Sequence, residues 1–361
     1  MHKTVLVVGA SGLVGSATIR QFCLQSDWKV VGISRRSAIV NCDYDFYSTD
    51  LLSPESISLA LKQVPEIHLV IYAALFEMTD LVAGWHSQHQ MQINQQMLEN
   101  LFEAFGEKIS TLEQVILLQG AKAYGAHLGM LPIPAKENAP RVEHANFYWL
   151  QEDYLRKIQK VSSWNLTVFR PQIVFGDAIN TAMNLVPALG VYGAILKNNG
   201  RDLDFPGGPP VLLEAIDADL LASAFVWAAS CTEANNETFN ISNGDVFVWE
   251  NIWPTLAHSL GMNVGKKIPC LLSEFLPARE NEWAKIVNRY GLLAPKMMEF
   301  VGKGFQYADV LLATLANERP APKILSTIKI RQAGFNQCMD TEDMMAKWMR
   351  IFQQRKLLPL P

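Results

Sequence analysis

Apolar runs and stretches of helical spacing alternate along the first 176 residues of the chain. Five of the runs are rich in aliphatic residues without polar alternation, which is typical of strands buried on both faces. These predicted strands lie at residues 4–8, 28–33, 68–73, 115–119 and 166–170. The predicted helices between them lie at residues 13–25, 54–64, 91–105 and 147–161. Strands that alternate with helices in this way predict an α/β fold with a doubly wound parallel sheet.

The regular alternation stops after Gly176. A turn-rich loop is expected at residues 204–210, a helix at 216–229, and a short strand returning to the main sheet at 239–242. Residues 250–320 predict helices and no strand. We therefore expect a Rossmann-type core and a smaller, mainly helical C-terminal substrate-binding lobe. The core is expected at residues 1–176, with returning segments near 213–245 and 324–340. The lobe is expected at residues 177–212 and 246–323, and a C-terminal helix and tail at 341–361.

Composition limits the classes of partner. The formal net charge of −4 leaves no basic surplus for nucleic acid or an anionic membrane. The five cysteines are widely spaced and fit no zinc pattern, so we expect reduced thiols in a cytoplasmic protein. The longest apolar stretch, residues 184–196, contains Pro187 and is too short to cross a bilayer. His86 and His89 have no third ligand in register, so a surface pair is expected rather than a metal site.

A glycine motif directly follows the first predicted strand. Residues 9–15 read G-A-S-G-L-V-G, in which Gly9 allows the tight turn, Gly12 lets the backbone approach a pyrophosphate, and Gly15 permits close packing of helix on sheet. The helix that follows presents free N–H groups and a positive dipole end to phosphates. The strand–loop–helix context makes this a specific prediction of dinucleotide binding through the loop and the residues Ser11, Leu13 and Val14.

The second predicted strand leads into Ser34, Arg35 and Arg36. NAD enzymes place an acid here for the ribose 2′-hydroxyl, whereas a guanidinium matches a 2′-phosphate. We therefore expect NADP(H) rather than NAD. Asp50, at the end of the next short strand region, is expected to contact the adenine, although a helix-start aspartate is an equal interpretation.

Residues 146–153 read N-F-Y-W-L-Q-E-D, which resembles the N-F-Y-Y-x-x-E-D block of the progesterone 5β-reductase and iridoid synthase family. The likeness spans nearly the whole chain in one order. It continues in residues 170–176, 183–186, 191–197, 217–220, 240–247, 305–312 and 334–335. The resemblance implies an extended short-chain dehydrogenase/reductase that uses NADPH to reduce C=C bonds conjugated to a carbonyl.

The same resemblance implies catalytic residues. The family lysine lies in a T-G-x-K-x-Y-x-G block, which residues 119–125 (Q-G-A-K-A-Y-G) match, so Lys122 takes its place. Gly120 replaces the serine of other short-chain dehydrogenases, as it does in this family. The family tyrosine is the second of the Y-Y pair. Strict counting places it at Trp149, while Tyr148 matches the first.

The usual Tyr-x-x-x-Lys motif is absent, because residues 152 and 153 are acidic. An enolate formed by conjugate reduction needs a nearby donor or cation, and Lys122 and Tyr148 are our candidates. The indole N–H of Trp149 is an alternative donor that would leave protonation to water. The other interpretation is that Trp149 only lines the substrate pocket.

The remaining site residues are expectations of the same kind. Further cofactor contacts are expected at Leu51, Ala73, Ala74, Gln119, Pro171, Ile173 and Val174, in addition to Lys122 and Tyr148. The substrate pocket is expected at Trp149, Met183, Phe305 and Tyr307.

Three functions remain open from the sequence. The first is an NADPH-dependent 1,4-reductase of α,β-unsaturated carbonyl compounds. The second is a carbonyl or aldehyde reductase or an epimerase-type relative, and the third is an NADP-binding sensor without turnover. The expected partner is a small enone or carbonyl compound, with no nucleic acid and no membrane, and a homodimer is the default expectation.

Overall fold

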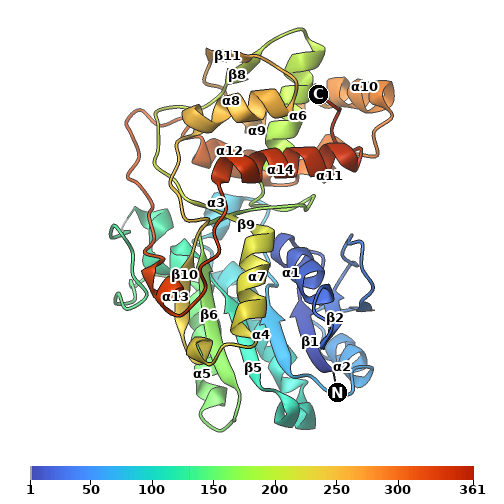
Figure 1. The fold of residues 1–361 in the computed structure, drawn as a ribbon, viewed down its shortest axis with the longest axis vertical. Helices are drawn as coiled ribbons and strands as arrows, with labels where there is room; N and C mark the ends of the chain where they lie inside the picture. The colour runs from blue at the N-terminus through green and yellow to red at the C-terminus, as the bar shows by residue number, and fades with distance from the viewer. Residues whose placement is uncertain (1, 130) are drawn as a thin grey trace. The chain divides into compact units, whose positions relative to one another are not determined.

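A computed structural model of the chain describes residues 2–129 and 131–361 (Figure 1). Within them, a seven-stranded sheet runs in the order β10-β6-β5-β4-β1-β2-β3. Every neighbouring pair in it is parallel. Its strands are β1 (Lys3–Val8), β2 (Trp28–Ser34), β3 (Asp45–Ser48), β4 (Leu69–Tyr72), β5 (Gln114–Leu118), β6 (Asn165–Pro171) and β10 (Thr238–Ile241). The predicted parallel sheet is thus confirmed.

The sheet is covered on both faces, as the unbroken apolar runs require. Leu6 and Val8 of β1 share one buried cluster with residues of α2, α4 and α5. The alternate β1 side chains point to the opposite face, and α1 packs there against α7. The helices on this sheet are α1 (Leu13–Cys23), α2 (Pro54–Lys62), α4 (Gln88–Glu103), α5 (Phe147–Gln159) and α7 (Ala218–Ala228). Shorter helices are α3 (Leu81–Gly84), η1 (Gly106–Thr111), η2 (Ala121–Tyr124), η3 (Ala126–Leu128), η4 (Thr232–Ala234) and α13 (Ile328–Gln332).

The glycine loop lies where the strand order reverses, between β1 and β4. Gly9 has φ +89°, and a Cβ on it would lie 2.9 Å from the carbonyl oxygen of Ala73, which follows β4. A Cβ on Gly15 would lie 2.1 Å from the carbonyl oxygen of Gly9. Helix α1 can therefore begin directly above the end of β1 only because both positions lack a side chain.

The chain divides into two compact units. The first unit contains residues 1–172, 218–241 and 325–337, and the second contains residues 173–217, 242–324 and 338–361. The sequence-based boundary stood at residue 176. The second unit holds the strand pairs β7–β9 and β8–β11 and a set of helices. Its helices are α6 (Val186–Asn198), α8 (Trp249–Ser259), α9 (Leu272–Phe275), η5 (Pro277–Arg279), α10 (Glu280–Tyr290), α11 (Met297–Val301), α12 (Gly304–Leu311) and α14 (Thr341–Gln354).

One expectation for the second unit is wrong, and the start of one predicted helix shifts by two residues. Residues 250–320 contain the strand β11 (Val264–Lys267), which pairs with β8 (Leu203–Phe205) where only a turn-rich loop was expected. Residues 264–267 read V-G-K-K and are mostly exposed. The segment therefore lacks the apolar pattern from which a strand is predicted. The helix expected at 216–229 begins at Ala218, because the preceding residues form β9 (Ala215–Asp217) and pair with β7 (Ile173–Phe175).

We expect Gly15→Ala to lower the free energy of unfolding by about 1–3 kcal/mol, because its methyl group would meet the backbone of Gly9 and force α1 outward. Gly12→Ala is the matched control. Its Cβ would lie 3.2 Å from the nearest heavy atom, the carbonyl oxygen of Gly9, so stability should change far less. Urea denaturation of both variants checks this, and equal losses would contradict it.

Candidate active site

Helix α1 opens without a side-chain cap. Its N-cap is Gly12, with φ −76° and ψ 171°, which has no side chain to cap the first free N–H groups. Leu13 and Val14 form the start of the helix. A Cβ on Gly12 would have only the Gly9 carbonyl near it, so the side of the loop away from the sheet is open to a ligand. The N–H groups and the helix dipole make this end of α1 suited to phosphate.

The arginine segment is tied to this loop by Ser34. The Ser34 hydroxyl accepts the Ser11 N–H at 3.2 Å and donates to the carbonyl oxygen of Arg36 at 2.5 Å. Arg35 and Arg36 are both exposed. Neither forms an ion pair with any residue in the described part of the chain. The backbone of the arginine segment is thus tied to the glycine loop, and both arginine side chains are exposed.

The expected adenine contact at Asp50 remains a prediction. Its carboxylate accepts the N–H of Leu52 at 3.0 Å, which is the local bond of a turn before a helix. The carbonyl oxygen of the neighbouring Leu51 accepts from Asn100 of α4 at 2.9 Å. Ala74, like Ala73, lies against Gly9 beside the glycine loop.

Tyr148 stands at the start of α5, directly opposite Gly120. Its hydroxyl oxygen lies 3.3 Å from the place that a Gly120 Cβ would occupy, and the carbonyl oxygen of Pro171 lies 3.6 Å from the same place. The side chain of Asn146 caps α5 by accepting the N–H of Tyr148 at 3.0 Å. Burial raises the pKa of Tyr148 above its usual range, and the carboxylate of Glu77 raises it further. The phenol therefore stays protonated at neutral pH and can donate a hydrogen bond.

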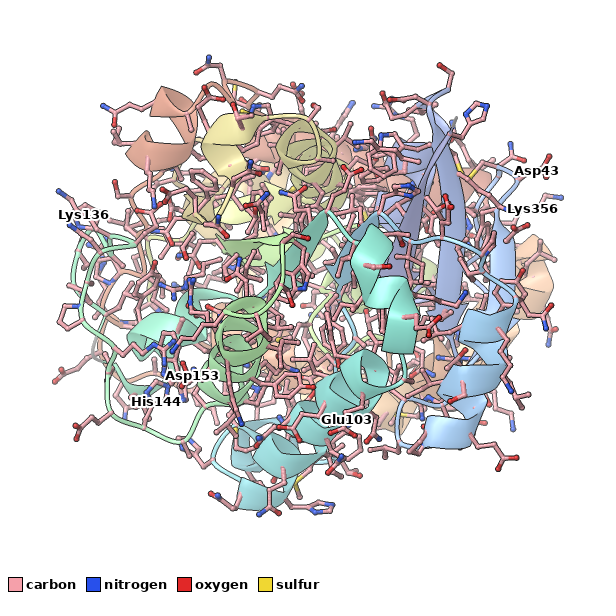
Figure 2. The ribbon with its side chains drawn as sticks, turned by 90° about the horizontal axis from the view of Figure 1, so that it is seen from below. Asp43, Glu103, Lys136, His144, Asp153 and Lys356 are labelled. Atoms are coloured by element: carbon pink, nitrogen blue, oxygen red, sulfur yellow. The ribbon has the colours of Figure 1, made fainter. Side chains whose placement is uncertain are left out.

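Lys122 lies on η2, a segment separate from α5. Its carbonyl oxygen accepts from the Asn146 side-chain amide at 3.1 Å, so Asn146 links the segment of Lys122 to the helix of Tyr148. A ring nitrogen of His144 lies 3.2 Å from the same carbonyl oxygen. Figure 2 labels His144, on the loop that leads into α5, and Asp153 of the helix. The two candidate catalytic residues are thus held by one shared side chain.

Trp149 is buried, and two guanidinium groups lie close to its ring. Its ring centroid lies 4.4 Å from the guanidinium carbon of Arg141 and 5.2 Å from that of Arg170. Its Nε1 is buried and makes no hydrogen bond within the described residues. Stacking of this kind fixes the ring beside the arginines, and a role in the substrate pocket stays a prediction.

Glu152 gathers charge around α5. Its carboxylate accepts from Arg156 at 2.8 Å and from Gln119 at 2.9 Å, and lies 3.5 Å from both Arg141 and Arg170. Burial by itself raises the pKa of Glu152, but the hydrogen bonds from Arg156 and Gln119 and the charges of Arg156 and Arg170 outweigh it. The pKa is therefore held below its ordinary value. We call this set of five side chains the Glu152 cluster.

The cluster joins α5 to the ends of two strands. Gln119 follows β5 and accepts from Arg170 of β6 at 2.8 Å, and it donates to the carbonyl oxygen of Tyr148 at 3.2 Å. Sequence reasoning had proposed Gln119 only as a cofactor contact. It missed Glu152 and Arg170 as a pair, although both lie in blocks that carry the family resemblance.

The other predicted contacts lie in the second unit. Ile173 and Val174 belong to β7. Met183 precedes α6, while Phe305, which is buried, and Tyr307 lie on α12. Helices α6 and α12 pack against each other, which places the expected pocket residues of this unit in one region.

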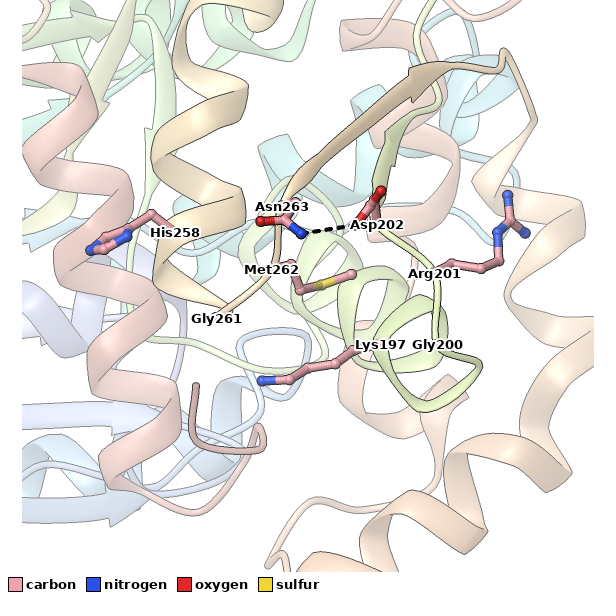
Figure 3. Close-up of a pocket in the computed structure, with 8 residues that line it drawn as sticks. All are labelled: Lys197, Gly200, Arg201, Asp202, His258, Gly261, Met262 and Asn263. Carbon is pink, nitrogen blue, oxygen red and sulfur yellow. Dashed lines mark hydrogen bonds between the residues drawn. The ribbon is translucent and has the colours of Figure 1, made fainter.

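A surface pocket of about 360 Å³ in the second unit holds none of the predicted site residues (Figure 3). Its lysine donates to the carbonyl oxygen of Leu260, and Asn263 donates to Asp202 at 3.3 Å. The pocket is lined by Lys197, Gly200, Arg201, Asp202, His258, Gly261, Met262 and Asn263.

The described residues lack the features of two other kinds of site. Among residues 2–129 and 131–361, no group of three or more His, Cys, Asp or Glu side chains is arranged to hold a metal ion. In the same residues, no helix has the length and hydropathy needed to cross a bilayer. All five cysteines are free. Cytoplasmic location and a homodimer stay predictions.

The sequence from residue 49 to residue 359 matches the PRISE-like Rossmann-fold domain. This range covers most of the chain, including Lys122, Tyr148 and the Glu152 cluster. The chain belongs to the PRISE-like Rossmann-fold family. The glycine loop and the two arginines precede the matched range, so their interpretation depends on the geometry described above.

Named relatives of this PRISE-like chain are similar along nearly its whole length. It is 31% identical to (S)-8-oxocitronellyl enol synthase of Nepeta racemosa, over 99% of this chain and 94% of the relative. It is 29% identical to 3-oxo-Delta(4,5)-steroid 5-beta-reductase of Arabidopsis thaliana, with the same coverage.

Solved structures support the fold. UDP-glucose 4-epimerase of Thermotoga maritima, in a structure with UDP-glucose, has a TM-score of 0.67 and 15% identity, over 97% of this chain and 99% of that one. UDP-glucose 4-epimerase of Thermus thermophilus, in complex with NAD, has a TM-score of 0.65 and 15% identity with the same coverage. At this identity the likeness concerns the fold alone.

We expect Glu152→Gln in this PRISE-like protein to lower the free energy of unfolding at pH 7 by about 3 kcal/mol, since the buried guanidinium group of Arg170 loses its counter-charge. The folded-state pKa of Glu152 is below the ordinary value of 4.5. The contribution of the Glu152 carboxylate to the free energy of unfolding is therefore present above pH 4.5. It is lost as the pH falls through the folded-state pKa. The variant should lack this part of the acid-induced destabilisation.

Urea denaturation at pH 7 and at about pH 3, on either side of the window below 4.5, measures both effects. Glu113→Gln is the matched control, because Glu113 pairs with Lys3 at 2.6 Å with both side chains about half exposed. That variant should change stability by less than about 1 kcal/mol. Equal effects of the two substitutions would show that the Glu152 cluster is not a stabilising centre.

Proposed function

We propose that the protein is an NADPH-dependent reductase that adds hydride to the β-carbon of α,β-unsaturated carbonyl compounds. The observation that carries the proposal is the position of the Tyr148 hydroxyl beside Gly120, with the Lys122 segment tied to the same helix start through Asn146. The relatives support the same class, since one is named as a steroid 5-beta-reductase and another as an oxocitronellyl enol synthase.

The described residues fit the dinucleotide. The uncapped start of α1 and the open side of Gly12 would hold the pyrophosphate. Arg35 and Arg36, exposed and without ion pairs in the described chain, would grip a 2′-phosphate in charge-assisted bonds. When bound, the reduced nicotinamide supplies the hydride.

Tyr148 and Lys122 would act on the carbonyl oxygen of the substrate. Hydride addition to the β-carbon places negative charge on that oxygen, and a preorganised donor stabilises it. The raised pKa of Tyr148 keeps its O–H in place as the donor, and the Lys122 ammonium adds a positive charge. We assign the donor role to Tyr148 rather than Trp149, because the Trp149 indole is buried under two guanidinium groups.

The assay that tests the proposal uses NADPH carrying deuterium at the transferred position. Purified protein is mixed with enones and with matched saturated ketones, and the products are analysed by mass spectrometry and NMR. Deuterium at the β-carbon supports the proposal. Deuterium at the carbonyl carbon supports a carbonyl reductase instead, and NADPH binding without any product supports a sensor.

We expect Tyr148→Phe to lower kcat for an enone by about a hundredfold, which is the typical loss of one preorganised donor. NADPH affinity should change less than threefold, because the phosphate loop is untouched. Tyr154→Phe is the matched control on the same helix, where the ring packs on the sheet core, and it should keep its activity. Steady-state kinetics and calorimetry measure both, and full activity of Tyr148→Phe would remove Tyr148 from the mechanism.

We expect the double variant Arg35→Ala, Arg36→Ala to bind NADPH at least tenfold more weakly while NADH binding changes little, because only NADPH carries the 2′-phosphate. Arg331→Ala, an exposed arginine of α13 in the same unit, is the control. Calorimetric titration of both dinucleotides measures the ratio. An unchanged NADPH-to-NADH preference would refute the assignment of these arginines.

A further inference from the structure

The lysine of the candidate site needs support that other short-chain dehydrogenases do not need. In a Tyr-x-x-x-Lys motif the two side chains lie one helical turn apart, so a single helix positions both. In this chain the residue four after Tyr148 is Glu152, and Lys122 lies on η2 instead. The side chain of Lys122 has four rotatable bonds and must be held by residues from elsewhere in the fold.

Trp85 is in contact with that side chain. The Lys122 Nζ lies 3.6 Å from the centre of the Trp85 ring, the shortest cation–π distance in the described chain. This is the geometry in which the negative face of an indole attracts an ammonium group. The ring of His127 lies beside Trp85, with centroids 6.5 Å apart and planes at 78°. Trp85 is therefore close both to the lysine ammonium and to a side chain of the η3 segment.

The turn that carries Trp85 is itself fixed. Trp85 directly follows α3, and the N–H of Gly84 donates to the carbonyl oxygen of Asp80 at 2.9 Å. The side chain of Gln90 accepts the N–H of Met78 at 2.8 Å. The same side chain lies against Gly84, since a Cβ added to Gly84 would be 2.5 Å from the Gln90 Oε1. Gln90 is buried in α4. The indole is thus presented by a turn anchored to a long helix.

The Trp85 indole contacts the Lys122 ammonium through the face of its ring. Its Nε1 is buried and makes no hydrogen bond in the described residues, so no polar bond of its own sets the orientation of the ring. The ring face is the surface left to interact with charge, and the Lys122 ammonium lies on it.

We propose that Trp85 is a positioning residue for Lys122, holding its ammonium group in place through the face of the indole. The role in turnover rests on the proposed function, whereas the contact itself does not. Replacement of Trp85 by a smaller aromatic ring should weaken the hold, and replacement by an aliphatic side chain should abolish it, because the strength of the contact follows the ring quadrupole.

NMR of the full chain with ¹³Cε-labelled lysine tests the contact without any reaction. The Lys122 signal is identified by its loss in Lys122→Arg. It should lie upfield of the other lysine signals in the wild type, because the ring current shields protons above an indole. It should return to the range of the others in Trp85→Leu and lie between in Trp85→Phe. An unshifted wild-type signal, or a shift that survives in Trp85→Leu, overturns the proposal.

Kinetics test the role. With NADPH and an enone, Trp85→Leu should lower kcat by about tenfold, Trp85→Phe should lower it less, and the KM for the enone should change less than kcat. Trp227→Leu is the matched control, since Trp227 is a half-buried tryptophan of the same unit whose ring meets Phe239 and Phe335. It should keep kcat within twofold.

The outcomes separate the two proposals. Circular dichroism of Trp85→Leu first establishes that the variant folds. Wild-type kcat in a folded Trp85→Leu overturns the positioning role. If the wild type reduces no enone, the proposed function fails, while the NMR comparison still decides whether Trp85 holds Lys122.

Discussion

A carboxylate that is taken out of water must be matched by positive charge and hydrogen bonds, and the candidate site is arranged around one such group, that of Glu152. Its partners come from several parts of the chain: the loop before α5, α5 itself, and the ends of β5 and β6. Arg170 extends the set by donating to Tyr124 at 3.1 Å, and Tyr124 donates to Asn240 of β10 at 2.6 Å. Charge balance thus joins α5 to three adjacent strands.

This arrangement separates two tasks that other short-chain dehydrogenases combine in one helical turn. The Glu152 cluster and the Asn146 cap set the position of Tyr148, while Lys122 stands on its own short helix against an aromatic ring. The bare Gly120 leaves space beside the phenol where a serine would otherwise stand. Under the proposed function, the donor and the cation are thus supplied by two segments that Asn146 connects.

Features that depend on neighbours in the chain could be predicted from the sequence. The parallel sheet follows from unbroken aliphatic runs, and the glycine loop follows from its place between strand and helix. Features that depend on distant pairing could not. Strand β11 has no apolar pattern and forms only because β8 lies beside it. Trp85 gives no local signal, since its contact with Lys122 joins residues that are 37 positions apart in the printed sequence.

The chain passes between the two compact units five times, and this affects its synthesis. The first 172 residues contain most of the main sheet, but β10, the strand beside β6, ends only at Ile241. Helix α7, which packs on α1, also follows a segment of the second unit. When synthesis has reached β6, the outer edge of this strand is therefore still unpaired, and the face of α1 that packs on α7 is still uncovered. Such edges invite aggregation, so the growing polypeptide is most vulnerable while residues 173–241 are being translated.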